Sequence, residues 1–457
     1  MIKKIISIIY LLITLLFIGL LFKIDILPSN ILFPIILISI GTSILNIFLL
    51  LKFKNTIINT IVLLFVFLIS TFYIFGIYQL GTTISFITSI NNIKDIENKY
   101  YVLVKKDSSY YKIKDIRNKD MGYMNEMDKK VWDKLPIKVK KNKYDNQTNL
   151  YNDLIDKKVD SIIVSGAYLY FLEEYNNYLD KDVRIIYSIK VRKSKNKIKI
   201  KESNGSFNIL VSGIDTYGKI SKVSRSDVNI IMSVNPKTGK VLLTHIPRDY
   251  YVQLHDTVGY KDKLTHSGIY GVDKTVDTIE DFMEIDIDYY IRINFDTLVK
   301  LVDEIGGIDI NSDISLNKKN CPIKKGINHL DGKCALAYSR ERKAYASGDR
   351  HRGENQEQVI TVIIKRFSTN KTLILKYNDI LKSMDGMFET NFGSINLSTL
   401  VKNQIKNNTS WNVESISVDG YDSSNYTYSY YGSKLYVMEP DMETVNIARD
   451  KIKEVTS

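Results

Sequence analysis

The sequence predicts a membrane-anchored α/β protein, and three observations support this fold class. The first eighty residues contain three long apolar segments without charged residues. After them, short runs rich in β-branched and aromatic residues alternate with helical patterns, as is typical of α/β domains. The chain has 457 residues, which is enough for two or three domains with cores of their own.

The three apolar segments cover residues 5–22, 31–51 and 57–80, and they are 18, 21 and 24 residues long. Each can cross a hydrocarbon core of about 30 Å as a helix. Buried helices of a soluble domain are the alternative, but such helices usually keep a polar stripe, which these segments lack. We therefore expect residues 1–80 to form an anchor of three transmembrane helices.

Lysines beside these segments predict the orientation of the anchor. Lys3 and Lys4 precede the first segment, and two more lysines lie in the link LKFKN between the second and third, whereas Lys23 is balanced by Asp25. Positively charged loops stay in the cytoplasm. No small-residue cleavage site follows the first segment, so it is expected to remain as an anchor. We expect a multi-pass protein of the cell membrane, with a cytoplasmic N-terminus and the bulk of the chain outside.

The formal net charge of +12 fits three kinds of partner: nucleic acid, anionic lipid or an acidic polymer. The expected position outside the membrane excludes nucleic acid. Cys321 and Cys334 both fall in this external part, 13 residues apart. A disulfide between them is favoured there, with two free thiols as the alternative.

The external part divides into two predicted domains. In residues 98–200, the segments YYVLVKK, VDSIIVS and VRIIYSIKV predict strands, and NLYNDLIDKK and AYLYFLEEYNNYL predict helices. This pattern indicates a small accessory α/β domain, and its role cannot be derived from its residues. A lysine-rich and serine-rich linker, residues 190–206, ends in Asn204-Gly205. A second, larger domain is expected to span residues 205–457.

The stretch SRERKAYASGDRHRGENQEQ, residues 339–358, is rich in arginine. Only twelve of the 63 basic residues are arginine, yet this stretch holds Arg340, Arg342, Arg350 and Arg352. Arginine offers a planar fork of donors that matches phosphate or carboxylate, whereas lysine would be enough for solubility. The cluster predicts an anionic ligand, and solvated helix charges paired with nearby acids are the alternative.

A predicted hairpin brings further charges together. SDVNIIMSV and KVLLTHI are strands joined by the turn NPKTGK, and their antiparallel pairing sets Asp227 opposite Arg248. Period-two alternation places Arg225, Asp227 and Asn229 on one face. Asp215 ends the preceding strand, FNILVSGID. A simple ion pair at the strand edge, with Asp215 as a turn cap, is the alternative to a binding site.

Three helices follow. DTLVKLVDEIGG is amphipathic and ends at glycine, and DGKCALAYSRER places Arg340 one turn after Leu336. A third helix begins between residues 349 and 354 and presents Arg352, Gln356 and Ile360 on one side. Its first turn would direct the positive end of the helix dipole at an anion.

Seven ordered motifs within about residues 205–370 resemble the LytR–CpsA–Psr family: ILVSGID, SRSD, IPRDYYV, KLTHSGIYG, INFDTLVKLVDEIGGIDI, HLDGKCALAYSRERK and GDRHRGENQEQVI. The three-span anchor resembles the capsule-associated type. The resemblance implies an α/β/α domain with a central mixed sheet and an apolar pocket for a polyprenyl chain. It also implies a phosphotransferase that moves a glycopolymer, wall teichoic acid or capsular polysaccharide, from its polyprenyl-pyrophosphate carrier to peptidoglycan.

The resemblance also assigns roles to single residues. The pyrophosphate-binding positions are Arg225, Arg248, Arg340, Arg342, Arg352 and Gln356, with Arg350 as a second-tier candidate; Asp215 and Asp227 are the expected ligands of Mg²⁺ or Mn²⁺, and Asp249 and Asp349 the expected supporting acids. Asp227, Arg225, Arg248 and Arg340 are the expected catalytic residues. Magnesium suits this chemistry because it takes oxygen ligands and often only one or two carboxylates.

Two other functions use the same residues. A membrane-bound regulator would bind the lipid-linked polymer without chemistry, and a hydrolase would use water in place of the peptidoglycan hydroxyl. A complete set of arginines and aspartates favours the enzyme over the regulator. Asp227 and Asp215 are both candidates for the general base. Lys263 and His266, in KLTHSGIYG, are expected to be structural or to lie at the rim.

Overall fold

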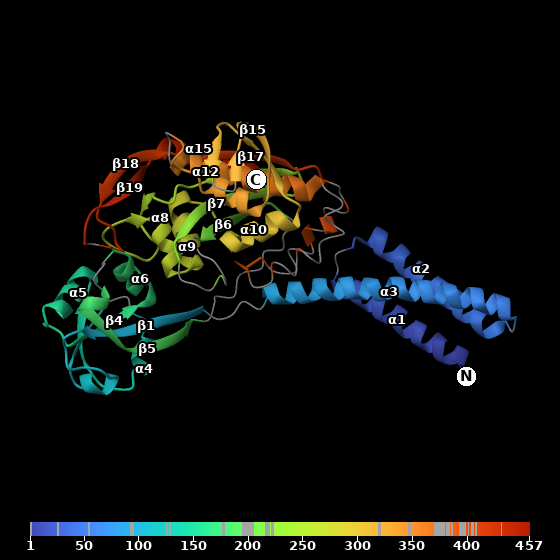
Figure 1. Cartoon of the computed structure of the whole chain (residues 1–457), viewed down its shortest axis with the longest axis horizontal. Helices are drawn as coiled ribbons and strands as arrows, with labels where there is room; N and C mark the ends of the chain where they lie inside the picture. Colours follow the sequence, from blue (N-terminus) through green and yellow to red (C-terminus); the bar gives the residue numbers. More distant parts are fainter. Residues whose placement is uncertain are drawn as a thin grey trace.

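The protein is represented by a computed structural model of the whole chain. The structure describes residues 2–24, 27–53, 55–91, 96–124, 127, 129–145, 147–175, 179–193, 205–214, 220, 224–318, 321–345, 349–369, 380, 384, 387–392, 399–400, 402–403, 406, 409–430 and 432–457. Three units follow one another along the chain, namely a helical hairpin with a third helix, a small sheet and a larger sheet (Figure 1).

The first unit consists of α1 (Ile2–Ile24), α2 (Ser29–Lys52) and α3 (Thr56–Asn91). All three helices are long and apolar enough to cross a membrane, and they coincide with the three predicted apolar segments. Tyr10, Phe17 and Tyr73 pack between the helices, and Thr14 hydrogen-bonds Ser43 over 3.0 Å. Most of the other large apolar side chains face outward, as expected for helices surrounded by lipid.

The second unit is a five-stranded mixed sheet in the order β3-β2-β4-β1-β5. Its strands are β1 (Ile96–Lys105), β2 (Asp120–Met124), β3 (Lys140–Tyr144), β4 (Ser161–Ser165) and β5 (Val183–Lys193), and its helical segments are η1 (Ile113–Ile116), α4 (Lys130–Asp133), α5 (Gln147–Ile155), α6 (Gly166–Tyr175) and α7 (Leu179–Asp182). The expected α/β pattern is present. The sequence did not predict β2 and β3, because the edge strand KKNKY lacks apolar residues to reveal its period.

The third unit is built on a six-stranded mixed sheet in the order β16-β11-β6-β7-β8-β17. Its strands are β6 (Phe207–Ile214), β7 (Ser226–Asn235), β8 (Lys240–His245), β11 (Tyr289–Asn294), β16 (Phe388–Thr390) and β17 (Asn412–Ser417). β6, β7 and β8 pair antiparallel, whereas β11 and β17 add in parallel at the two sides. All eight residues of β6 are buried, because helices cover both faces of the sheet.

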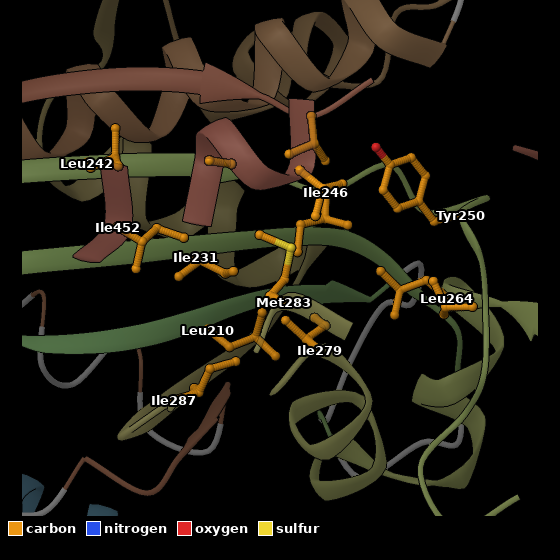
Figure 2. Close-up of a cluster of buried hydrophobic side chains, with 14 of the residues drawn as sticks. Leu210, Ile231, Leu242, Ile246, Tyr250, Leu264, Ile279, Met283, Ile287 and Ile452 are labelled. Atoms are coloured by element: carbon orange, nitrogen blue, oxygen red, sulfur yellow. The ribbon is translucent and has the colours of Figure 1, made fainter. Parts of the chain in front are cut away.

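Two helical layers sandwich this sheet and confirm the α/β/α architecture. On one face, Leu210, Ile231 and Leu242 of the strands pack against α9 (Val272–Met283) and α15 (Met442–Thr456), as Figure 2 shows. On the other face lie α10 (Phe295–Glu304), α11 (Gly332–Ser339) and α12 (Asp349–Thr369). Smaller elements complete the unit: β9 (Tyr251–Val252), β10 (Asp262–Lys263), α8 (Leu264–Tyr270), β12 (Ile308–Ser312), β13 (Leu316–Lys318), β14 (Cys321–Ile323), β15 (Gly326–Leu330), β18 (Gly420–Asn425) and β19 (Leu435–Pro440).

The predicted register of the β7–β8 hairpin is confirmed, with Asn235 opposite Lys240 and Ile230 opposite His245. Strict alternation fails at the start of β7. The pairing with β6 shifts there and leaves Asp227 as an extra, bulged residue. Ser226 therefore lies on the side of Asn229 and donates to its Oδ1 over 2.7 Å. The expectation that Asp227 shares a face with Asn229 was wrong for this reason.

The two cysteines form a disulfide, as the sequence favoured. It joins Cys321 at the start of β14 to Cys334 in the first turn of α11, and the N-cap of that helix is Asp331. The bond thereby ties a two-stranded ribbon to the helix that ends at Ser339, next to the arginine-rich stretch.

Candidate functional site

A cavity of about 300 Å³ lies between the six-stranded sheet and the helices α10, α11 and α12. Its apolar lining includes Val211, Ile214, Val228, Ile293, Phe295, Leu298, Leu336, Val359 and Ile360; its polar lining includes Arg225, Asp227, Arg248, Arg340, Arg342, Arg352 and Gln356. All six residues assigned to pyrophosphate on sequence grounds therefore line one cavity, together with Asp227.

The bulged residue Asp227 lies at the centre of the polar lining. Its Oδ1 accepts from Arg248 Nη1 over 3.0 Å and from Thr265 Oγ1 over 2.8 Å. Burial alone would raise the pKa of the Asp227 carboxyl. The guanidinium groups of Arg248 and Arg225 and the hydrogen bond from Thr265 outweigh this effect, and the pKa is lowered. The carboxyl is therefore an anion at neutral pH.

Asp249 supports Arg248 from the other side. Its Oδ2 lies 3.4 Å from Arg248 Nε, and its Oδ1 lies 2.5 Å from Lys263 Nζ. Asp249 is buried and Lys263 nearly so, which makes this a shielded chain of alternating charges. The contacts fit the supporting role expected for Asp249, and Lys263 takes the structural position that the sequence indicated.

The helix α11 ends earlier than the sequence predicted. Its last residue is Ser339, and Arg340 is its C-cap, so Arg340 and Arg342 lie beyond the helix and not on its face. Both side chains are exposed, and the Arg340 guanidinium lies 4.2 Å above the centre of the Phe295 ring. A cation on an aromatic face keeps its charge while its direction is fixed. Phe295 is a site residue that sequence reasoning missed.

On α12, Arg352 and Gln356 lie one turn apart and both face the cavity, as predicted. They are buried, with exposed fractions of 9% and 8%. The helix begins at Asp349, within the predicted window. Asp349 and Arg350 belong to its first turn, but their side chains lie outside the described residues, as does the whole of Asp215.

The sequence did not single out two buried ionisable residues of this region, His245 of β8 and Glu357 of α12. Burial, with the charge of Arg352, lowers the pKa of His245 to about 3, so its ring is neutral. Burial raises the pKa of Glu357 to about 8, and its carboxyl accepts from Ser417 Oγ over 3.2 Å. Neither residue lines the cavity.

The cavity can accept a hard divalent cation at Asp227. This ionised carboxylate lies among the cavity-lining residues and offers the oxygen ligand that Mg²⁺ prefers. One or two carboxylates are often enough, because water and phosphate oxygens complete the shell. The residues present therefore fit the expected cation, and Asp215 remains a sequence-based candidate as its second ligand.

As a whole, the cavity is suited to an amphipathic anion. Its arginines can neutralise two or three charges on adjacent phosphate groups, and its apolar lining can cover a hydrocarbon chain. This cavity therefore combines arginine side chains and apolar side chains in one lining.

Comparison with known proteins identifies the family of the chain. The sequence profile of the LytR_cpsA_psr family matches residues 172–444. The polyisoprenyl-teichoic acid–peptidoglycan teichoic acid transferase TagU of Bacillus licheniformis is 34% identical over 231 residues, which cover 50% of this chain and 74% of that protein. TagU of Bacillus cereus is 32% identical over 274 residues, covering 59% of this chain and 88% of that protein.

Among solved structures, TagV of Bacillus subtilis is 32% identical, covers 56% of this chain and 98% of its own, and superimposes with a TM-score of 0.48. Both relatives are teichoic acid transferases by name, which confirms the prediction of a transferase enzyme. More than half of the chain matches the family profile. The chain therefore belongs to the LytR_cpsA_psr family.

Proposed function

We propose that the protein transfers an anionic glycopolymer, wall teichoic acid or capsular polysaccharide, from a polyprenyl-pyrophosphate carrier to peptidoglycan through a phosphodiester. Glycopolymer transfer in general is supported by relatives named as teichoic acid–peptidoglycan transferases. The observation that carries the finer proposal is the junction of arginines and apolar side chains in one cavity. A polyprenyl pyrophosphate has the same two parts, a charged head and a hydrocarbon chain.

The apolar side chains would hold the hydrocarbon chain. Leu298, Leu336 and Val359 come from three different helices that face the sheet, so they form walls rather than a flat surface. Each buried methylene contributes about 0.8 kcal/mol to binding. A few prenyl units inside the cavity would therefore account for a large share of the affinity.

The arginines would hold the pyrophosphate head. Arg248 is fixed by Asp227 and Asp249, and Arg352 is buried in the wall, so both are oriented before the ligand arrives. Arg340 and Arg342 are exposed at the entrance and would close over the head from outside. Donors oriented in advance stabilise charge that develops on phosphate oxygens without further reorganisation.

In the reaction, a sugar hydroxyl of peptidoglycan attacks the phosphorus atom that bears the polymer. A new O–P bond forms, the P–O bond between the two phosphates breaks, and polyprenyl phosphate leaves with the bonding electron pair. The hydroxyl proton passes to a base, for which Asp227 and Asp215 are the candidates. Bound at Asp227 and Asp215, Mg²⁺ or Mn²⁺ would neutralise charge on the phosphate oxygens.

The membrane anchor fits this substrate. A lipid-linked polymer keeps its head at the bilayer surface, so an enzyme with three apolar helices stays within reach of it. We propose that the N-terminus is cytoplasmic and that the catalytic unit lies outside, as in the capsule-associated three-span type. A reporter fused after Asn204 that works only in the cytoplasm would contradict this topology.

The reaction is tested with the full-length protein in detergent or nanodiscs. It is incubated with a polyprenyl-pyrophosphate oligosaccharide, peptidoglycan oligomers and Mg²⁺, and the products are analysed by mass spectrometry. We expect a phosphodiester-linked conjugate and free polyprenyl phosphate. Release of oligosaccharide phosphate without a conjugate would indicate a hydrolase, and binding without any product would indicate the regulator.

A further inference from the structure

The small sheet unit, residues 96–193, contacts the catalytic unit through α6 and α8. Ala167 and Phe171 of α6 form a buried cluster with Ile269 of α8. Phe171 is 0% exposed, although its helix belongs to the small sheet unit and not to the catalytic unit. Its ring meets the His266 ring edge-on, with 4.8 Å between the centroids. An aromatic side chain buried completely between two units is an anchor and not an incidental contact.

His266 is itself held firmly. Its Nδ1 lies 2.6 Å from Asp262 Oδ1, and both side chains are 0% exposed. The other oxygen of Asp262 accepts from the backbone N–H of Ser429 over 2.9 Å. Ser429 in turn lies 3.0 Å from the Tyr270 hydroxyl at the end of α8. Hydrogen bonds therefore hold α8 in place through His266 in its first half and through Tyr270 at its last residue.

The neighbouring residue Thr265 is buried and contacts the cavity-lining residue Asp227. Its hydroxyl donates to Asp227 Oδ1 over 2.8 Å, and its backbone N–H donates to Arg248 O over 2.8 Å. Further along α8, Gly268 packs so closely on β7 that a Cβ there would lie 2.5 Å from Ser226 N. A shift of α8 would therefore also displace Asp227 and Arg248.

We infer that α8 connects the small sheet unit to the catalytic cavity, with Thr265 as a positioning residue for Asp227 and Phe171 as the side chain that seats the helix. The inference rests on the proposed function, since it takes Asp227 to be catalytic. Reacting groups must be held within a fraction of an ångström, and supporting residues provide this accuracy. The small unit would thus contribute to transfer without touching the substrate.

The first test uses the full-length protein and distinguishes the effect of the Thr265 hydroxyl from the effect of the side-chain volume. Thr265→Val keeps the shape and removes the hydrogen bond, whereas Thr265→Ser keeps the hydroxyl. We expect Thr265→Val to lower kcat about tenfold to a hundredfold, the range for losing a hydrogen bond to a charged group. KM and affinity for lipid pyrophosphate should stay unchanged, and Thr265→Ser should restore most of the rate.

Thr278→Val is the matched control, because Thr278, in the neighbouring helix α9, is also buried and its hydroxyl accepts a hydrogen bond from the backbone N–H of His255. If Thr265→Val keeps the rate of this control, or if Thr265→Ser loses as much as Thr265→Val, the positioning role is wrong. A further variant, Asp227→Ala, distinguishes a failure of the proposed function from a failure of the role proposed for α8. Wild-type turnover in Asp227→Ala contradicts the catalytic role that the proposed function gives to Asp227, whereas loss there and none in Thr265→Val contradicts only the role of α8.

The second test addresses the seating of the helix. Phe171→Ala is compared with Leu169→Ala, which truncates the same helix α6 inside the core of the small sheet unit. Thermal unfolding is recorded for both, and turnover is measured where both are folded. We expect Phe171→Ala to lower kcat up to about tenfold, less than Thr265→Val because the contact is one step further from Asp227. Equal turnover in the two variants would overturn the connection.

Discussion

The mouth and the interior of the cavity are built in different ways. Three polar residues of the mouth come from places where regular structure ends or is interrupted: Asp227 at a bulge, Arg248 just after β8 and Arg340 just after α11. Interior residues such as Leu298 and Val359 come from the middle of helices. Irregular positions can bring several charges to one point, whereas regular faces provide an even apolar wall. The mouth should therefore determine the rate, and the interior should mainly determine lipid affinity.

The largest effect is expected at the centre of the mouth. Asp227→Ala should abolish transfer and leave appreciable binding of lipid pyrophosphate, because arginines and apolar walls remain while the ionised carboxylate is lost. Asp215→Ala should behave alike if it is the second metal ligand. Transfer is measured as conjugate formed, and binding with a labelled lipid. Near wild-type turnover in either variant would mean that the replaced acid is structural. Asp309→Ala serves as the control, because Asp309 is exposed and pairs with His329 at the surface.

A smaller but clear effect is expected from replacing arginine by lysine. Arg352→Lys and Arg340→Lys keep the charge but lose the planar fork, and each lost contact to a charged group costs about 1.5–3 kcal/mol of binding free energy. Both lipid affinity and transfer rate should fall about tenfold or more. Lys343→Arg, three residues after Arg340 and exposed, should change neither. Activity near wild type in both lysine variants would mean that the cluster serves another purpose, because exposed ion pairs contribute only about 0–1 kcal/mol.

If the apolar interior holds the hydrocarbon, binding affinity should depend on the length of the polyprenyl chain. Leu298→Trp would narrow the cavity from the α10 side, so affinity for a long polyprenyl pyrophosphate should fall while a short-chain analogue binds as before. The measurement is a series of dissociation constants against prenyl number for wild type and variant. Parallel curves for the two proteins would show that the hydrocarbon lies elsewhere.

The smallest effect on transfer is expected from the disulfide. The bridge closes a loop between residues 13 positions apart, which stabilises the fold by about 3 kcal/mol in the chain-entropy description. Cys321→Ser or Cys334→Ser should lower the melting temperature and leave transfer near wild type at 25 °C. The melting temperature of the wild type, but not of either variant, should then fall when a reductant is added. A large loss of transfer in a still-folded variant would give the bridge a direct part in the site.

The comparison between mouth and interior also explains what the sequence could predict. The length of the uncharged apolar segments located the anchor, the apolar run FNILVSGID located the strand β6, and helical periodicity located α12. Hairpin symmetry placed Asp227 opposite Arg248. The bulge at Asp227 and the early end of α11 at Ser339 were not predictable, because they depend on how the strands and helices pack around the cavity.

The contact between Phe171 and His266 was hidden for a related reason. It joins residues 95 positions apart in two separate units, and neither residue shows a pattern of its own in the sequence. His266 was therefore predicted only as structure or rim, and Thr265 was not singled out. The residues that hold the site in place were harder to predict than those that would bind the ligand. Clustered arginines and aspartates indicate an ionic site from the sequence alone, whereas a threonine that will be buried has no such signal.

The most direct test of the account is a comparison of three ligands on the full-length protein: polyprenyl pyrophosphate, polyprenyl alcohol of the same length, and inorganic pyrophosphate, each titrated with Mg²⁺ present. If one cavity holds the head in its arginine mouth and the chain in its apolar interior, the joined molecule should bind at least about a hundredfold more tightly than either part, because linked groups share one loss of translational freedom. Arg352→Lys should weaken the pyrophosphate ligands only. Equal affinity for the joined lipid and for either part alone would contradict a single site with two halves.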